Sequence, residues 1–238
     1  MMDASFQIRR AADRGHAAND WLDAHFSFSF GDWHDPLWPR FGPLLAINED
    51  RVQPGRGFAM HPHANLEILM LPRQGRIEHR DNFGGHTTIA PGELMRMRAG
   101  TGIRHSQMNP SADEIDHHFQ IWLAPRTTGV EPQVQTLRLM PPVAGSWVVI
   151  ASAAGADGLP IDADATVSWG RADKGAPLAL PARPAKSRYL HVMCGELSVN
   201  GQPLCAGDAL VLPDAAQPLM LAARHGAEVL GFELPGIR

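Results

Sequence analysis

The chain contains the segment Gly55-Arg-Gly-Phe-Ala-Met-His61-Pro-His63-Ala-Asn-Leu-Glu67, and further on the segment Ala99-Gly-Thr-Gly-Ile-Arg-His105-Ser-Gln107-Met-Asn109. In a β-strand, side chains two residues apart lie on the same face. We therefore expect His61, His63 and Glu67 to share one face of a first strand, and His105 and Gln107 one face of a second. If these strands face each other inside a barrel, three imidazoles and one oxygen donor converge on a single metal ion.

The composition is that of a folded protein. Of the 238 residues, 44% are hydrophobic and 19% are charged, which argues against disorder. The net charge of −4 gives no general attraction to nucleic acid or to an anionic membrane. No apolar stretch reaches the roughly 18 residues of a membrane-spanning helix, and the first residues lack the apolar core of a signal peptide. We expect a cytoplasmic protein that binds neither membrane nor nucleic acid directly.

Short apolar runs separated by glycine, proline and Asp/Asn turns fill residues 40–125. Runs such as 66–71 and 118–123 have the length of strands, and this punctuation is typical of a β-sandwich or barrel. Residues 17–22 contain turn- and cap-forming side chains, so a short helix is expected there.

The second half of the chain repeats the pattern of the first. Residues 75–95 and residues 195–210 share one pattern: a strand, a turn with glycine, a second strand, and a glycine followed by an acidic residue. Self-similarity at a long period indicates a duplicated domain. The sequence therefore predicts an all-β protein of two tandem jelly-roll-type barrels with a few short helices, divided as 1–135 and 136–238. Only the first half has a His-x-His, so a metal site is expected there alone; the second half offers the single His191.

The two cysteines are expected to be free thiols. Cys194 and Cys205 flank Asn200-Gly201, which is typical of a two-residue hairpin turn. That hairpin would pair Glu196 with Cys205 and leave Cys194 offset, so a disulfide is not expected.

Four sequence blocks resemble the pirin family, whose bicupin members include bacterial quercetin 2,3-dioxygenase-like proteins. The blocks are Trp21-Leu-Asp-Ala-His25-Phe-Ser-Phe-Ser-Phe30, Gly57-Phe-Ala-Met-His-Pro-His63 followed by Glu67, Glu78-His79-Arg-Asp81-Asn-Phe-Gly84, and Ala99-Gly-Thr-Gly-Ile-Arg-His-Ser106. The resemblance is dense over residues 16–125 and thin beyond them. It implies two cupin barrels, a divalent metal held by His61, His63 and His105, and dioxygenation of a flavonol such as quercetin.

One position departs from the family pattern. Pirins usually carry glutamate where this chain has Gln107, and that glutamate is the proposed acceptor of the substrate's proton. A glutamine cannot accept that proton, although its amide oxygen could be a weak fourth ligand. Alternatively Glu67 replaces the missing carboxylate as a ligand or base, or it orients an imidazole N–H without touching the metal. We favour the orienting role for Glu67.

The other histidines have weaker patterns. His79 is expected to line the pocket or to be solvated, and one of His117 and His118 should point inward from its strand. Structural roles are expected for the histidines without spaced partners, which are His16, His25, His34, His86, His191 and His225.

Three functions fit these patterns. The leading one is a flavonol dioxygenase, weakened by Gln107, that acts as a monomer on a small aromatic substrate. The alternatives are a non-catalytic, metal- or redox-responsive regulator with a protein partner, and a cupin that has lost its metal. Neutral imidazoles bind several divalent metals; Fe(II) is the expected ion, and Zn, Ni, Cu, Mn and Co are alternatives.

Overall fold

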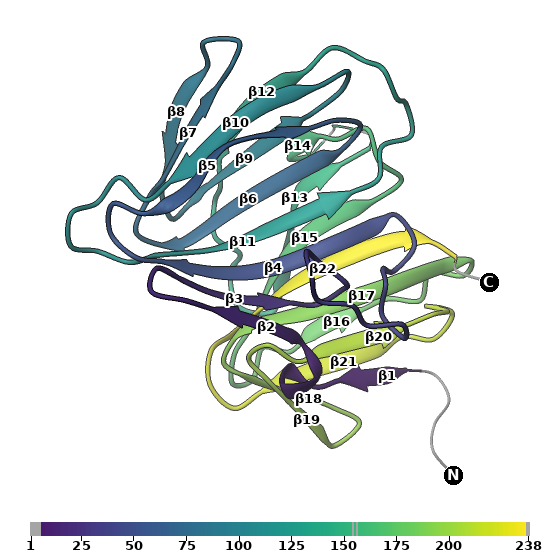
Figure 1. Ribbon diagram of the computed structural model, residues 1–238. Helices are drawn as coiled ribbons and strands as arrows, with labels where there is room; N and C mark the ends of the chain where they lie inside the picture. Colours follow the sequence, from purple (N-terminus) through teal and green to yellow (C-terminus); the bar gives the residue numbers. More distant parts are fainter. Residues whose placement is uncertain (1–5, 154, 156, 237–238) are drawn as a thin grey trace. The chain divides into compact units, whose positions relative to one another are not determined.

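The computed structural model describes residues 6–153, 155 and 157–236, and nearly all of their regular structure is β-strand (Figure 1). The one helix among these residues is a single 3₁₀ turn, Ala11–Asp13. The helix expected at residues 17–22 is wrong, because this region forms a hairpin of β2 (Gly15–Ala18) and β3 (Leu22–Phe26). In β3, the buried Ala24 and Phe26 alternate with more exposed residues, which is the period of a strand.

The chain forms two compact units. The N-terminal unit contains Arg14–Leu139 and Ile161–Ala163, and the C-terminal unit contains Met140–Pro160, Asp164–Arg238 and the described part of Met1–Asp13. The contiguous division expected from the sequence, at residue 135, stays a prediction.

The N-terminal unit consists of one large and one small antiparallel sheet. Besides β2 and β3, its strands are β4 (Leu44–Val52), β5 (Gly57–His63), β6 (Glu67–Gln74), β7 (Ile77–Asp81), β8 (His86–Ile89), β9 (Glu93–Arg98), β10 (Ile103–Met108), β11 (Asp116–Leu123) and β12 (Gln133–Arg138). The large sheet has the order β12-β9-β6-β11-β4-β3-β2, and the small one β5-β10-β7-β8. Ile68, Met70 and Met95 from the large sheet pack in one apolar cluster with Ile77 and Ile89 from the small sheet. The two sheets therefore enclose a shared core.

The C-terminal unit repeats this plan. Its strands are β1 (Gln7–Arg9), β13 (Ser146–Ser152), β14 (Leu159–Pro160), β15 (Thr166–Ala172), β16 (Leu178–Leu180), β17 (Lys186–Cys194), β18 (Glu196–Val199), β19 (Gln202–Cys205), β20 (Ala209–Leu212), β21 (Leu219–Ala223) and β22 (Ala227–Pro235). A seven-stranded sheet, β1-β20-β17-β22-β15-β13-β14, accompanies a four-stranded sheet, β16-β21-β18-β19. The repetition confirms the prediction of two cupin domains.

The hairpin around Asn200-Gly201 is also confirmed. Glu196 pairs with Cys205, and both Cys194 and Cys205 are free thiols. Across the described residues, the structure contains no helix with the length and apolar character needed to cross a membrane.

Candidate metal centre

The three predicted histidine ligands meet between β5 and β10 of the N-terminal unit. These strands pair antiparallel, with His105 directly opposite His61 and Ile103 opposite His63. One ring nitrogen of each histidine lies within 4.8 Å of those of the other two. A Cβ at Gly57 would collide with the backbone carbonyl oxygen of Gln107, so the glycine before the His-x-His permits the close approach of the two strands.

Hydrogen bonds orient two of these rings. His61 donates from Nδ1 to the carbonyl oxygen of Ala59 at 2.7 Å, which leaves its Nε2 as the lone-pair nitrogen. The Nδ1 atoms of His105 and His79 are 3.2 Å apart, and His79 Nε2 is 3.1 Å from Asp81 Oδ2. An ionised carboxylate only accepts, so His79 carries its proton on Nε2 and accepts at Nδ1 from His105. His105 must then present its Nε2 lone pair.

The structure passes a specific test of fit to a metal. His105 Nε2 is buried and has no hydrogen-bond partner among the described residues, which is unusual for a buried polar atom and is relieved by ligation. Burial, with a contribution from His61, lowers the pKa of His105 to about 2 and that of His63 to about 4. Both rings are therefore neutral at pH 7, the state that binds metal. The relay through His79 and Asp81 was missed from the sequence, because it depends on the register of β7 and β10.

Gln107 belongs to the same site but has other polar partners. Trp122 donates from Nε1 to Gln120 Oε1 at 2.7 Å, and Gln120 donates from Nε2 to Gln107 Oε1 at 2.9 Å. Because an indole N–H can only donate, this chain fixes the direction of both amides. Gln107 must then donate from Nε2 to Nε2 of His118, 2.7 Å away. Its oxygen keeps one lone pair, so weak ligation by Gln107 stays a proposal.

Two influences oppose each other at His118. Burial lowers the pKa of His118, but the carboxylates of Asp116 and Asp50 outweigh it and raise this pKa to about 10. The hydrogen bond from Gln107 instead requires an unprotonated Nε2, since two donors 2.7 Å apart repel. His118 is therefore neutral in this arrangement, because a neutral ring satisfies each hydrogen bond from Trp122 through Gln120 and Gln107 to His118. With a residue at position 107 that accepts a hydrogen bond, Asp116 and Asp50 would favour the protonated form of His118.

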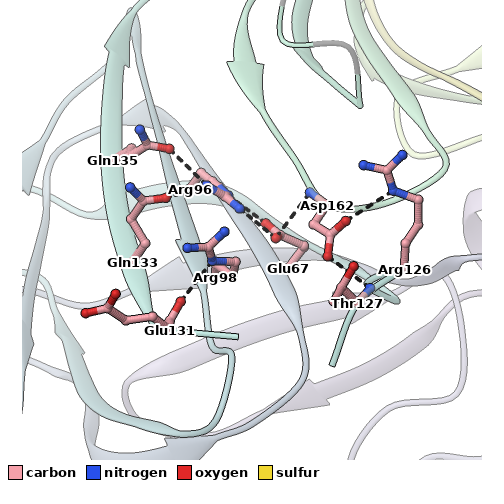
Figure 2. Close-up of polar contacts among 9 residues, drawn as sticks. All are labelled: Glu67, Arg96, Arg98, Arg126, Thr127, Glu131, Gln133, Gln135 and Asp162. Atoms are coloured by element: carbon pink, nitrogen blue, oxygen red, sulfur yellow. Dashed lines mark hydrogen bonds and ion pairs between the residues drawn. The ribbon is translucent and has the colours of Figure 1, made fainter. Parts of the chain in front are cut away.

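Glu67 is not part of this site. Its carboxylate accepts two hydrogen bonds of 2.7 Å from the guanidinium of Arg96, and it also accepts a 3.3 Å hydrogen bond from the backbone N–H of Asp162 (Figure 2). Both side chains of the ion pair are buried. The expected strand running from His61 to Glu67 is wrong: β5 ends at His63, and Asn65 has a positive φ of 48° that breaks the alternation. Glu67 then begins β6 in the other sheet.

A cavity of about 250 Å³ adjoins the histidines. His61, His63 and Gln107 contribute to its wall, and Asp50 is the only carboxylate among its described lining residues. The remaining wall is mostly apolar and aromatic, with Leu22, Ala24, Phe26, Phe30, Asn48, Phe58, Gln120 and Trp122. Phe26, Phe28 and Phe30 alternate with serines in the sequence. Phe26 and Phe30 line the cavity, whereas Phe28 is buried in the core.

Comparison with known proteins agrees with this architecture. Residues 6–123 match the family model described as Pirin, and residues 149–234 match the Quercetinase C-terminal cupin domain. A quercetin 2,3-dioxygenase of Escherichia coli K12 is 34% identical over 97% of this chain and 99% of its own length. The chain belongs to the pirin family.

Solved structures extend the comparison. The bacterial pirin YhhW from Escherichia coli, determined in complex with nickel(II), has a TM-score of 0.91 and 32% identity, covering 98% of this chain and 100% of its own. A quercetin 2,3-dioxygenase from Acinetobacter baumannii shares the fold at 21% identity and a TM-score of 0.77, covering 97% of this chain and 86% of its own.

Proposed function

We propose that this pirin is a metal-dependent dioxygenase of a flavonol such as quercetin. The observation that carries the proposal is the convergence of His61, His63 and His105 beside a cavity with aromatic walls. A flat, polyphenolic molecule suits such walls, because aromatic side chains stack on planar rings and exclude water. The names of the full-length relatives support the same substrate class.

In this proposal His61, His63 and His105 hold one divalent metal ion, with Gln107 or water as a further ligand. Fe(II) is our proposed ion; nickel is the alternative supported by the YhhW complex, and three imidazoles also suit Zn, Cu, Mn and Co. The bound metal would supply Lewis-acid polarisation of a phenolic oxygen and thereby lower its pKa. His79 and Asp81 keep the lone pair of His105 directed at this position.

We assign the role of proton acceptor to Asp50, in place of the family glutamate. Asp50 is a buried carboxylate on the cavity wall, and its Oδ2 lies 3.5 Å from Nε2 of His118. The proton of the flavonol 3-hydroxyl would pass to Asp50, while Gln107 can only form a neutral hydrogen bond. General-base catalysis is typically worth about 10²–10⁴-fold, so Asp50→Asn should lower turnover on that scale without removing the metal.

Aerobic consumption of quercetin by the metal-loaded protein, with metal analysis of the same sample, tests the proposed activity. His61→Ala should abolish metal binding and turnover together, while the exposed His225→Ala should change neither. Full metal occupancy without consumption of quercetin would contradict the activity.

The role of Asp50 has a separate readout. Without oxygen, quercetin bound to the wild-type protein should show the red-shifted absorption of its anion. Asp50→Asn should lose this shift, and adding Gln107→Glu should restore it. An unchanged spectrum in Asp50→Asn would exclude Asp50 as the acceptor.

A further inference from the structure

A second group of potential metal ligands lies on the β2–β3 hairpin. His16, Asp23 and His25 place one ligand atom each within 4.8 Å of those of the other two. None of the three lines the cavity beside the first histidine group. The sequence hides this group, because His16 and His25 are separated by a turn and only strand pairing brings them together.

The hairpin holds the two imidazoles side by side. His16 pairs directly with His25 across the two strands, and their rings stack with centroids 4.4 Å apart and planes inclined by 20°. Asp23 precedes His25 by two residues and therefore shares its face of β3. Asp23 Oδ1 lies 2.8 Å from His16 Nε2 and 3.8 Å from His25 Nδ1. This carboxylate oxygen is therefore within hydrogen-bond distance of His16 and close to His25.

These separations are close to those of a coordinated ion. Ligand atoms at the usual distance of about 2.0–2.2 Å from Zn²⁺ lie roughly 3–3.5 Å from one another. Side-chain rotation alone can provide the difference. The three side chains are 35–53% exposed, so an ion can enter from solvent and complete its coordination with water.

The local charges also permit a cation. Arg14 is close enough to His25 to lower its pKa, after the larger effect of burial, but its guanidinium forms a 3.0 Å ion pair with Glu49. Glu49 lies opposite His25 on β4, so these two charges compensate each other beside the ring. Asp23 supplies the negative charge of the group, and the exposed Arg51 lies opposite it on β4.

We propose that His16, Asp23 and His25 bind a second divalent transition-metal ion, separate from the one in the cavity. Two imidazoles and one carboxylate favour Zn²⁺, Cu²⁺ or Ni²⁺ over Mg²⁺ and Ca²⁺, which prefer sites made wholly of oxygen. With three protein ligands and wide exposure, the site would exchange its metal more readily than the buried one.

Calorimetric titration of Zn²⁺ into the untagged, chelator-treated full chain tests this site. The variant His61→Ala/His105→Ala removes the first site and should still bind one Zn²⁺ per chain. Adding His16→Ala/His25→Ala to that variant should abolish the binding, whereas adding His225→Ala should leave it unchanged. Side-chain NMR of the first variant should show zinc-dependent shifts of the His16 and His25 imidazole signals.

Asp23→Asn provides a milder test that retains the shape of the side chain. Loss of an anionic ligand should weaken Zn²⁺ binding by more than the roughly 10–100-fold that loss of an orienting partner costs. The proposal is overturned if the first-site variant binds no Zn²⁺, or if its binding survives the loss of both His16 and His25. Thermal unfolding of each variant confirms that it remains folded.

Discussion

Replacing Asp81 by asparagine should weaken metal binding, although Asp81 itself is not among the ligands. Asp81 Oδ1 accepts hydrogen bonds from the backbone N–H groups of Phe83 and Gly85, at 2.8 and 3.0 Å, while Oδ2 accepts from His79. An asparagine would keep its oxygen on the two backbone donors and turn its NH₂ group towards His79. The size and backbone contacts of the side chain would therefore be preserved, and only the direction of one hydrogen bond would change.

That single change propagates to the metal ligand. Facing a donor, His79 Nε2 would have to accept, and its proton would move to Nδ1. His79 would then donate to His105 Nδ1, and the proton of neutral His105 would lie on Nε2, where the metal requires a lone pair. Loss of an orienting partner typically costs about 10–100-fold in metal affinity. This corresponds to about 1.4–2.7 kcal/mol of binding free energy.

Competition between the protein and a chelator of known affinity for Ni²⁺ measures this change. Asp35→Asn is a matched control, because Asp35 Oδ1 also accepts from two backbone N–H groups, those of Leu37 and Trp38. The control should retain the wild-type dissociation constant. If Asp81→Asn also retains it, while both variants unfold at the wild-type temperature, the relay from Asp81 through His79 to His105 does not direct the ligand.

Three further predictions follow from the same contacts. Glu67→Gln should leave the metal content unchanged, as metal analysis can check. It should lower the free energy of unfolding by about 3–5 kcal/mol, because the buried guanidinium of Arg96 loses its anionic partner; denaturant unfolding measures this. Gln107→Glu should increase metal retention and quercetin turnover at pH 7, because it adds an anionic oxygen at the site. Turnover by the wild type as fast as by this variant would contradict the prediction. The metal-free protein should lose stability as the pH falls from about 6.5 to 4, because unfolded histidines bind protons there while His63 and His105 stay neutral. His63→Ala should flatten this pH dependence of the unfolding temperature.

Local patterns in the sequence predicted much of the fold and the convergence of the three histidines. The His-x-His spacing places two imidazoles on one strand, and glycine allows the next histidine strand to approach. The sequence also predicted the hairpin at Asn200-Gly201, because both residue types tolerate a positive φ. In the structure φ is 47° at Asn200 and 77° at Gly201. In each case the information lies within a few neighbouring residues.

The failures share a different physical origin. Strand alternation cannot be carried through a residue in the left-handed region, and Asn65 ends it between His63 and Glu67. His79 and His118 acquire their roles only through pairing with strands far along the chain. Strand alternation correctly predicted that one of His117 and His118 points inward, and His118 is the buried one. No spacing rule in one sequence reports the register between strands, so the hydrogen-bond partners of His79 and His118 were not predicted.

The side chains around Gln107 would also suit a carboxylate at this position. Gln120 donates to one end of this side chain, and a protonated His118 would donate to the other, so both neighbours suit a carboxylate. The buried Nε2 of His105, which has no hydrogen-bond partner among the described residues, also suits a site that binds metal. An unsatisfied buried polar atom costs about 1–3 kcal/mol, and a cupin that no longer bound metal would gain nothing in return. The geometry thus favours a metal-binding enzyme over a cupin that has lost its metal, because Gln107 leaves the three histidines converged on one point.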